Sequence, residues 1–184
     1  MIKKIRSKFS FKKGFTLVET LVAIAILSAA MAGPMTLAIK SIGTASISQD
    51  QLTAFYLGEE AIEYVKNVRD SNSNGSDPND PTTYWLNNLN PCIGLNLSGL
   101  KKTCQIEAIG GSVVSYDPNQ FLSFDQTTKQ YNYAITKGFT RTVHIDNPPV
   151  SGNGDEAIVT VIVSWQSKIG PRSLTLYDNL YNYK

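Results

Sequence analysis

One acidic residue, Glu19, lies within an otherwise uncharged apolar stretch near the N-terminus. Residues 15–39 read FTLVETLVAIAILSAAMAGPMTLAI, and Glu19 is the only charged side chain among them. A carboxylate inside a membrane span costs about 2.5–3.5 kcal/mol on insertion scales, and such residues usually have a function. We therefore expect Glu19 to find a cationic partner wherever this stretch leaves water.

The stretch that carries Glu19 is long enough to cross a bilayer as a helix, which takes about 20 apolar residues. It follows a basic block that contains six of the 17 lysines and arginines and no acid: Lys3, Lys4, Arg6, Lys8, Lys12 and Lys13. Positive residues beside a span stay in the cytoplasm, so we expect a single-pass chain with its C-terminal body outside. The rest of the chain contains eleven basic and 15 acidic residues, so its net charge is negative. A mildly acidic body does not indicate a nucleic-acid partner.

Two general interpretations of this N-terminus compete with a specialised one. The first is a secretory signal peptide, with an apolar stretch at residues 15–29 and an A-x-A-like cleavage site at Ala30-Met31-Ala32. The second is an uncleaved membrane anchor. Neither interpretation supplies a partner for Glu19, so both leave the costly carboxylate without a function.

The third interpretation rests on a resemblance. The sequence KKGFTLVE at residues 12–19 closely resembles the leader and processing site of type IV prepilins and type II secretion pseudopilins. In that family a membrane peptidase cuts after the glycine and methylates the new N-terminal amine. The resemblance implies a cut between Gly14 and Phe15 by a prepilin peptidase and methylase. The mature chain would have 170 residues, with Glu19 at its fifth position, where the family has its glutamate.

The chemistry of these residues agrees with that processing. Methylation leaves the amine of Phe15 cationic, and the carboxylate of Glu19 lies about one helical turn away. Inside an apolar helix bundle, Glu19 can pair with the amine of a neighbouring pilin subunit, which fixes the axial register between the two. Gly14 suits the position before the cut, because a peptidase must approach the backbone closely there.

A helical pattern continues beyond the apolar stretch. Apolar residues recur at three- and four-residue steps or their sums, with charged residues mostly between them: Leu52, Phe55, Ala61, Ile62, Val65 and Val68. This spacing predicts one helix from Phe15 to Arg69 that lays an apolar face on a sheet. We expect Gly33-Pro34 to interrupt it by a kink or by local melting, because proline removes one helical hydrogen bond and clashes with the preceding turn.

A polar segment from Asp70 to Pro81 is predicted to end the helix. Its first half, Asp70-x-Asn72-x-Asn74-Gly75, matches the opening of an EF-hand calcium loop, but Pro81 stands where that loop needs a bidentate glutamate. Some pseudopilins bind calcium in surface loops, so two interpretations of this segment stay open: a calcium-binding loop and a solvated polar turn. Immediately after it, the sequence Tyr84-Trp85-Leu86 is expected to pack on the body.

The C-terminal half changes to a period of two. We predict strands at 112–116, 131–135, 139–145, 157–166 and 173–177, arranged as an antiparallel meander. A long N-terminal helix packed on such a sheet is the α+β architecture of pilins. The expected domains are a cleaved leader at 1–14, a transmembrane and assembly helix at 15–40, an amphipathic helix at 41–70, a variable loop region at 71–111 and a β domain at 112–184.

The sequence offers little other chemistry. No nucleophile–base pair, phosphate loop or zinc-type cluster stands out, and the lone His144 is expected to be a surface or structural residue of a strand. We therefore expect no enzyme activity, no cofactor and no metal. Cys92 and Cys104 would form a disulfide if the body is exported, worth roughly 3 kcal/mol for so short a loop.

These features favour a structural role, as a subunit of a type IV pilus-like filament on the cell surface or in the periplasm. The sequence VETLVAIAIL at residues 18–27 resembles minor pilins and minor pseudopilins more than major subunits, whose apolar segments more often begin with a Leu-Ile-Glu-Leu type sequence. Pilus, type II secretion and DNA-uptake systems stay open as alternatives. A pilin-like adhesin is a further one, with its binding surface in residues 70–111.

Overall fold

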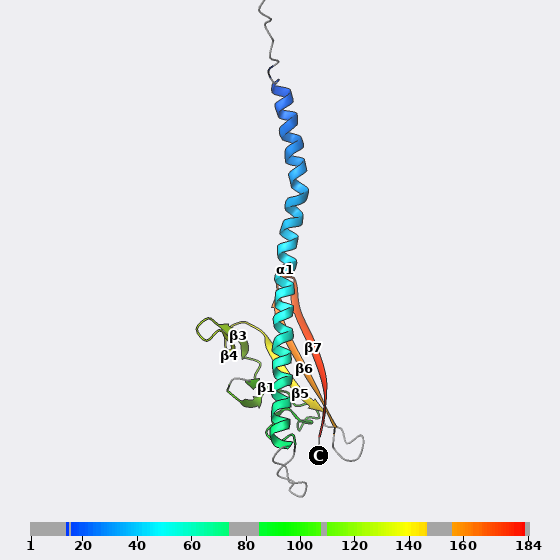
Figure 1. Cartoon of the computed structure of the whole chain (residues 1–184), viewed down its shortest axis with the longest axis vertical. Coiled ribbons are helices and arrows are strands. Elements are labelled where there is room, and N and C mark those ends of the chain that lie inside the picture. Colours follow the sequence, from blue (N-terminus) through cyan, green and yellow to red (C-terminus); the bar gives the residue numbers. More distant parts are fainter. Residues whose placement is uncertain (1–13, 15, 74–84, 108–109, 147–155, 183–184) are drawn as a thin grey trace, which may run out of the picture. The chain divides into compact units, whose positions relative to one another are not determined.

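The computed structural model describes residue 14 and residues 16–73, 85–107, 110–146 and 156–182. The chain divides into two compact units, residues 1–46 and residues 47–184 (Figure 1). Helix α1 (Leu17–Ser73) contributes to both units. Each unit is therefore described by itself, the first as the N-terminal segment and the second as the body.

Helix α1 contains 57 residues and passes through Pro34 without an interruption in its assignment. The helix therefore does not melt at Gly33-Pro34, one of the two forms of interruption that the sequence predicts there. A proline costs a helix about 3 kcal/mol or more, because one hydrogen bond is lost. The neighbouring residues are mostly alanine, leucine, isoleucine and methionine, which favour the helix strongly enough to carry it across that defect. At its other end the helix extends to Ser73, four residues beyond the predicted Arg69.

The body contains a five-stranded antiparallel sheet in the order β2-β1-β5-β6-β7. Its strands are β1 (Cys104–Glu107), β2 (Ser112–Ser115), β5 (Thr140–Asp146), β6 (Glu156–Ser167) and β7 (Gly170–Tyr181). A separate hairpin of β3 (Phe121–Asp125) and β4 (Gln130–Ala134) lies between β2 and β5 in the chain (Figure 1). The predicted meander holds only for β5–β6–β7, because β1 pairs with β5 and the hairpin leaves the sheet.

Strand β6 shows the predicted two-residue alternation. Its buried residues share one face: Ala157, Val159, Val161, Val163 and Trp165. It pairs along its whole length with β7, from Glu156 opposite Tyr181 to Ser167 opposite Gly170. Gly170 makes the tight connection there, at a φ of +125° that a side chain rarely allows.

The core forms where the body's part of α1 lies on this face of the sheet. Ala54, Ala61, Ile62 and Val65 are buried and pack in one cluster with residues of β5, β6 and β7, and Leu57 is also buried. Gly58 allows this close approach, since a Cβ atom there would collide with the side chain of Leu176 on β7. The predicted α+β fold, a long N-terminal helix packed on a C-terminal antiparallel sheet, is confirmed.

The connection between α1 and β1 also belongs to the core. Trp85, Leu86 and Leu89 are buried, followed by the short 3-10 helix η2 (Asn90–Cys92). Cys92 and Cys104 are joined by a disulfide with a Cα–Cα distance of 4.8 Å, and both are fully buried. Tyr84 lies outside the described residues, while Trp85 and Leu86 pack on the body as the sequence predicts.

Candidate processing and assembly site

The start of α1 is fixed by Thr16. Its hydroxyl oxygen accepts a hydrogen bond from the backbone N–H of Glu19 at 3.2 Å, and its carbonyl accepts one from Thr20 at 3.2 Å. Thr16 is therefore the N-cap residue, and Glu19 occupies the third helical position. Gly14 lies outside the helix and is exposed. The predicted cut after Gly14 thus falls before the helix, where Gly14 is free of the helical hydrogen-bond pattern; Phe15 itself lies outside the described residues.

The fold of the chain does not explain why residue 14 is a glycine. A Cβ atom built at Gly14 meets nothing within 4 Å, and its φ is not in the left-handed region. A side chain could therefore be accommodated without strain in this chain alone. A need for glycine at this position must come from another molecule that approaches the backbone.

The Glu19 side chain is exposed on the first turn of α1. It forms no ion pair with any other residue that the structure describes. Its neighbours Val18, Leu21 and Val22 are apolar and more than half exposed. The carboxylate is thus presented within an apolar surface and is available to a cation on another molecule.

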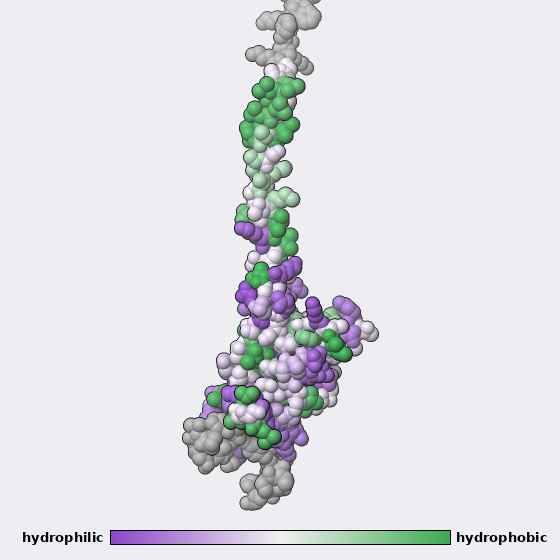
Figure 2. Space-filling view, turned by 180° about the vertical axis from the view of Figure 1, so that it is seen from behind, coloured by the Kyte–Doolittle hydropathy of each residue, from purple (hydrophilic) through white to green (hydrophobic). Residues whose placement is uncertain are grey.

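That apolar surface extends along the N-terminal segment, which is coloured hydrophobic over its first turns in Figure 2. Within the described residues, α1 is the one helix long and apolar enough to cross a membrane, with a mean hydropathy of 2.0 and none of that window buried. Its hydroxyl groups are satisfied internally, since Ser28 donates to the carbonyl of Ile24 at 2.8 Å and Thr36 to that of Ala32 at 2.9 Å. Such a helix exposes few unsatisfied polar groups to lipid.

Comparison with known families matches residues 10–33 to the model described as the prokaryotic N-terminal methylation motif. The match contains Gly14, Thr16 and Glu19. The chain therefore carries the N-terminal motif of a type IV pilin-like prepilin. No curated protein and no solved structure matches this prepilin, so its body is interpreted from its own residues.

The capping role of Thr16 was not predicted from the sequence. A signal was present, because Thr16-x-x-Glu19 before an apolar run is the pattern of a helix capping box. Glu19 can also interact favourably with the positive end of the helix dipole, which is a structural role within one chain. This role and pairing with another subunit are compatible, since the bond to Thr16 uses the backbone N–H of Glu19 and leaves its carboxylate free.

Arg141 was also missed, and it links three parts of the prepilin body. Its guanidinium is 1% exposed and donates to the carbonyl of Leu57 at 2.7 Å, to the Glu60 carboxylate at 2.6 Å and to the carbonyl of Ile106. One side chain on β5 therefore binds both α1 and β1. An arginine between Thr140 and Thr142 looks like a solvent-facing strand residue, so no local pattern indicates this burial.

His144, expected to be structural or on the surface, is buried and structural. Its Nδ1 atom lies within hydrogen-bond distance of the Lys102 carbonyl, and its Nε2 atom lies 2.9 Å from a carboxylate oxygen of Asp146. The pKa of Asp146 is held below its ordinary value, chiefly by the hydrogen bond from Lys101 and in smaller part by His144. These contacts hold the loop between Cys92 and Cys104 against β5.

The opening of the proposed calcium loop has other contacts. Asp70 pairs with Arg69 at 2.7 Å, and the Asn72 side chain donates to the carbonyls of Trp85 and Asn87. Both residues lie within α1, and residues 74–84 lie outside the described part of the chain. No cluster of three or more metal-ligating side chains occurs among the residues that the structure describes.

Proposed function

We propose that this prepilin is cut after Gly14, methylated on Phe15 and assembled as a subunit of a type IV pilus-like filament. The observation that carries this proposal is the lone Glu19 carboxylate, exposed on an uncovered apolar helix within the matched methylation motif. A prepilin peptidase and methylase and other pilin subunits are the partners that this function requires.

The energetics of the N-terminal segment support two successive environments. Burial of apolar surface is worth roughly 25 cal/mol per Å², so a helix with this exposure is unfavourable in water. A bilayer covers it first, as a single span with the body outside. In a filament, helices of neighbouring subunits would replace the lipid, and the buried Glu19 carboxylate would then need a cation. The amine of Phe15 on an adjacent subunit is such a cation.

The finer assignment is a minor subunit of a pilus, because residues 18–27 resemble minor more than major subunits. A minor pseudopilin of a type II secretion or DNA-uptake system is the alternative with the same chemistry. The number of copies per filament distinguishes a minor from a major role, and the genes required for its assembly identify the system.

The substitution Glu19→Ala tests the proposal. It should leave insertion and cleavage intact, because removal of a charge from a span favours insertion. It should shift processed protein from sheared filaments to the membrane, since loss of one partner of a buried ion pair costs about 3–5 kcal/mol. Methylation of Phe15 should also fall if the methylase uses this carboxylate.

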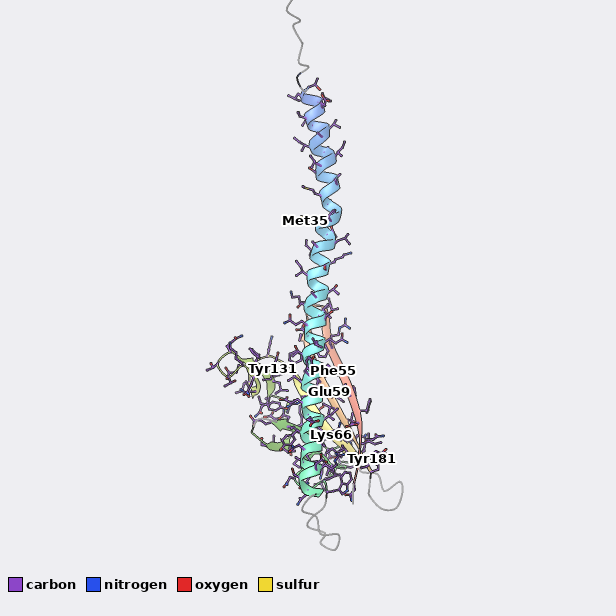
Figure 3. The ribbon with its side chains drawn as sticks, in the orientation of Figure 1. Met35, Phe55, Glu59, Lys66, Tyr131 and Tyr181 are labelled. Carbon is purple, nitrogen blue, oxygen red and sulfur yellow. A yellow bond between two sulfur atoms is a disulfide. The ribbon has the colours of Figure 1, made fainter. Side chains whose placement is uncertain are left out.

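Glu59→Ala is the matched control, because Glu59 is also an exposed acid on α1 but lies in the body (Figure 3). It should leave the filament fraction and methylation unchanged. Normal incorporation and normal methylation of the Glu19→Ala protein would contradict the proposed role of Glu19. A partial loss would point to a position at the filament tip, where one neighbour is absent.

A further inference from the structure

Three leucines on the turn that follows Cys92 are exposed to solvent. Leu95, Leu97 and Leu100 are 59%, 109% and 66% exposed. Together with Lys101 and Lys102 they form what we call the knob, residues 94–102. Clustered exposed leucines are unfavourable in water, and a contiguous apolar patch usually marks a contact with another molecule.

The knob is held by its own hydrogen bonds. The side-chain oxygen of Asn96 accepts from the backbone N–H groups of Ser98 at 3.0 Å and Leu100 at 2.9 Å, and the Asn96 N–H donates to the Leu100 carbonyl at 2.7 Å. Gly94 and Gly99 adopt positive φ angles of 78° and 74°. The Cys92–Cys104 disulfide closes the base of this turn. The leucines are therefore exposed by an ordered structure.

The knob stands on the face of the sheet that is opposite α1. On β5, Arg141 contacts α1, whereas His144 contacts the Lys102 carbonyl and Asp146 pairs with Lys101. Alternate residues of a strand point to opposite faces, so Arg141 lies on one face and His144 and Asp146 lie on the other. The base of the knob at Lys101 and Lys102 therefore contacts the face of β5 that is turned away from α1.

A groove with complementary chemistry lies beside α1. It has a volume of about 400 Å³ between the helix and the β3–β4 hairpin, and it is lined by Thr53, Tyr56, Leu57, Glu60, Gln130 and Tyr131. Figure 3 shows Tyr131 on the hairpin near the level of Phe55 on α1. A hollow of this volume is in the range that holds small ligands, and so admits leucine side chains. Tyr56 at its rim is 63% exposed.

We propose that the knob of one copy of this chain docks in the groove of a second copy, an inference that rests on the proposed filament function. The apolar leucines of the knob would contact the apolar lining of the groove. Lys102 is exposed and joins no ion pair among the described residues, and it would bring a positive charge to Glu63, an exposed acid on α1 about one turn from Glu60. The contact joins two different surface patches, so it is heterologous and can repeat along a filament. Two adjacent copies are sufficient, which a minor subunit at a tip also allows.

Paired cysteines in the full-length chain test this contact. Leu97→Cys with Tyr56→Cys in one chain should give cross-linked dimers after mild oxidation of sheared filaments, and a ladder of larger species where more than two copies are adjacent. The matched control replaces Tyr56→Cys with Tyr177→Cys, since Tyr177 is similarly exposed at 70% but lies on β7 outside the groove. The control pair and each single variant should give no cross-linked dimer or larger species.

The outcomes separate this inference from the proposed function. Filaments that contain the Leu97→Cys/Tyr56→Cys protein but show no cross-linked dimer or larger species would overturn the knob contact and leave filament membership intact. Cross-linking of the Leu97→Cys single variant to dimers alone would also overturn it, because two knobs would then meet each other. Processed protein that never enters filaments would contradict the proposed function. In that case the same oxidation of purified full-length protein in detergent decides the knob contact.

A second variant tests the contact between knob and groove without introduced cysteines. Leu97→Asp should lower the share of protein in filaments about tenfold, the effect expected when one well-buried leucine contact is lost. Ile135→Asp is its control, because Ile135 is 87% exposed and outside both surfaces. Equal filament shares for the two variants would overturn the proposal.

Discussion

Two stretches of the same helix have opposite environments. From Leu17 to Ile42, every residue of α1 is exposed, although the stretch is mostly apolar. From Ala54 to Val65, the apolar residues Ala54, Ala61, Ile62 and Val65 are buried against the sheet of the same chain, and Leu57 is also buried. The first stretch has a hydrophobic surface all round, while the second has one apolar stripe and charged residues outside it.

This difference shows where each stretch obtains its stability. The body's part of α1 is satisfied by its own chain, through core packing and the Arg141 contacts. The N-terminal segment has no such cover among the described residues, so lipid or other helices must supply it. Substitutions in the two stretches should therefore differ in kind: one set should change folding of the body, and the other should change insertion or assembly.

The largest effect on folding is expected at Arg141. Arg141→Ala leaves Glu60 without its cation and the Leu57 and Ile106 carbonyls without a donor, and should lower the free energy of unfolding by about 3–5 kcal/mol. Arg172→Ala, at an exposed arginine on β7, should change it by less than about 0.5 kcal/mol. Chemical denaturation of the full-length protein in detergent measures both. Similar stabilities for the two variants would show that the body does not depend on this link.

The same substitution at two leucines of α1 compares the stretches directly. Leu57→Ala should destabilise the body by about 2–5 kcal/mol, because Leu57 is 5% exposed. Leu27→Ala, at 57% exposure, should leave the body unchanged. Tryptophan fluorescence is a selective probe, since the chain's two tryptophans, Trp85 and Trp165, are both buried in the body. A loss of stability of the body in the Leu27→Ala protein would contradict the conclusion that the body is stabilised independently of the N-terminal segment.

The sequence predicted the features that depend on local pattern. The apolar run, the period-two strands β5 to β7 and the polar end of α1 each follow from residues close in the chain. Strands β1 and β3 were missed because neither alternates: Cys104, Gln105 and Ile106 are all buried in β1, and β3 mixes aromatic and polar residues within five positions.

Features that depend on distant contacts could not be predicted. The burial of Arg141 requires the Leu57 carbonyl, 84 residues away, and the Ile106 carbonyl, 35 residues away. The pairing of β1 with β5 likewise joins residues separated by the whole β3–β4 hairpin. The Thr16 cap differs from these, because its capping-box pattern with Glu19 is local and was available in the sequence.

The next effect concerns Cys92 and Cys104. Replacement of both by serine should lower the stability of the body by about 3 kcal/mol, the loop-entropy value for this spacing. In the native exported protein neither thiol should react with an alkylating reagent until a reductant is added. Full labelling without reductant would mean that the exported protein lacks the bond.

The smallest effect is expected at the ion pair between Lys66 on α1 and Asp178 on β7, whose charged groups are 2.8 Å apart. The hydrogen bond to Asp178 raises the pKa of Lys66 above 10.5, although burial acts in the opposite direction. Because the folded pKa is the higher one, the stabilisation is complete below pH 10.5 and is lost as the pH rises through the raised pKa.

Both side chains of this pair are about one-third exposed, so solvent screening limits its contribution to less than about 1 kcal/mol. Asp178→Asn should therefore be slightly less stable than the natural protein near neutral pH. The difference should shrink in strongly alkaline solution. A difference that grows with rising pH would contradict the assigned cause.

The mass of the mature N-terminus tests the central claim most directly. Full-length protein isolated from membranes and from sheared filaments should yield an N-terminal peptide that begins at monomethylated Phe15, with the leader absent. This result would follow from a cut after Gly14 and would place Glu19 at the fifth mature position. An N-terminus at Gly33 would indicate a signal peptidase, and an intact leader at Met1 would indicate an uncleaved anchor. Either of these would contradict the account.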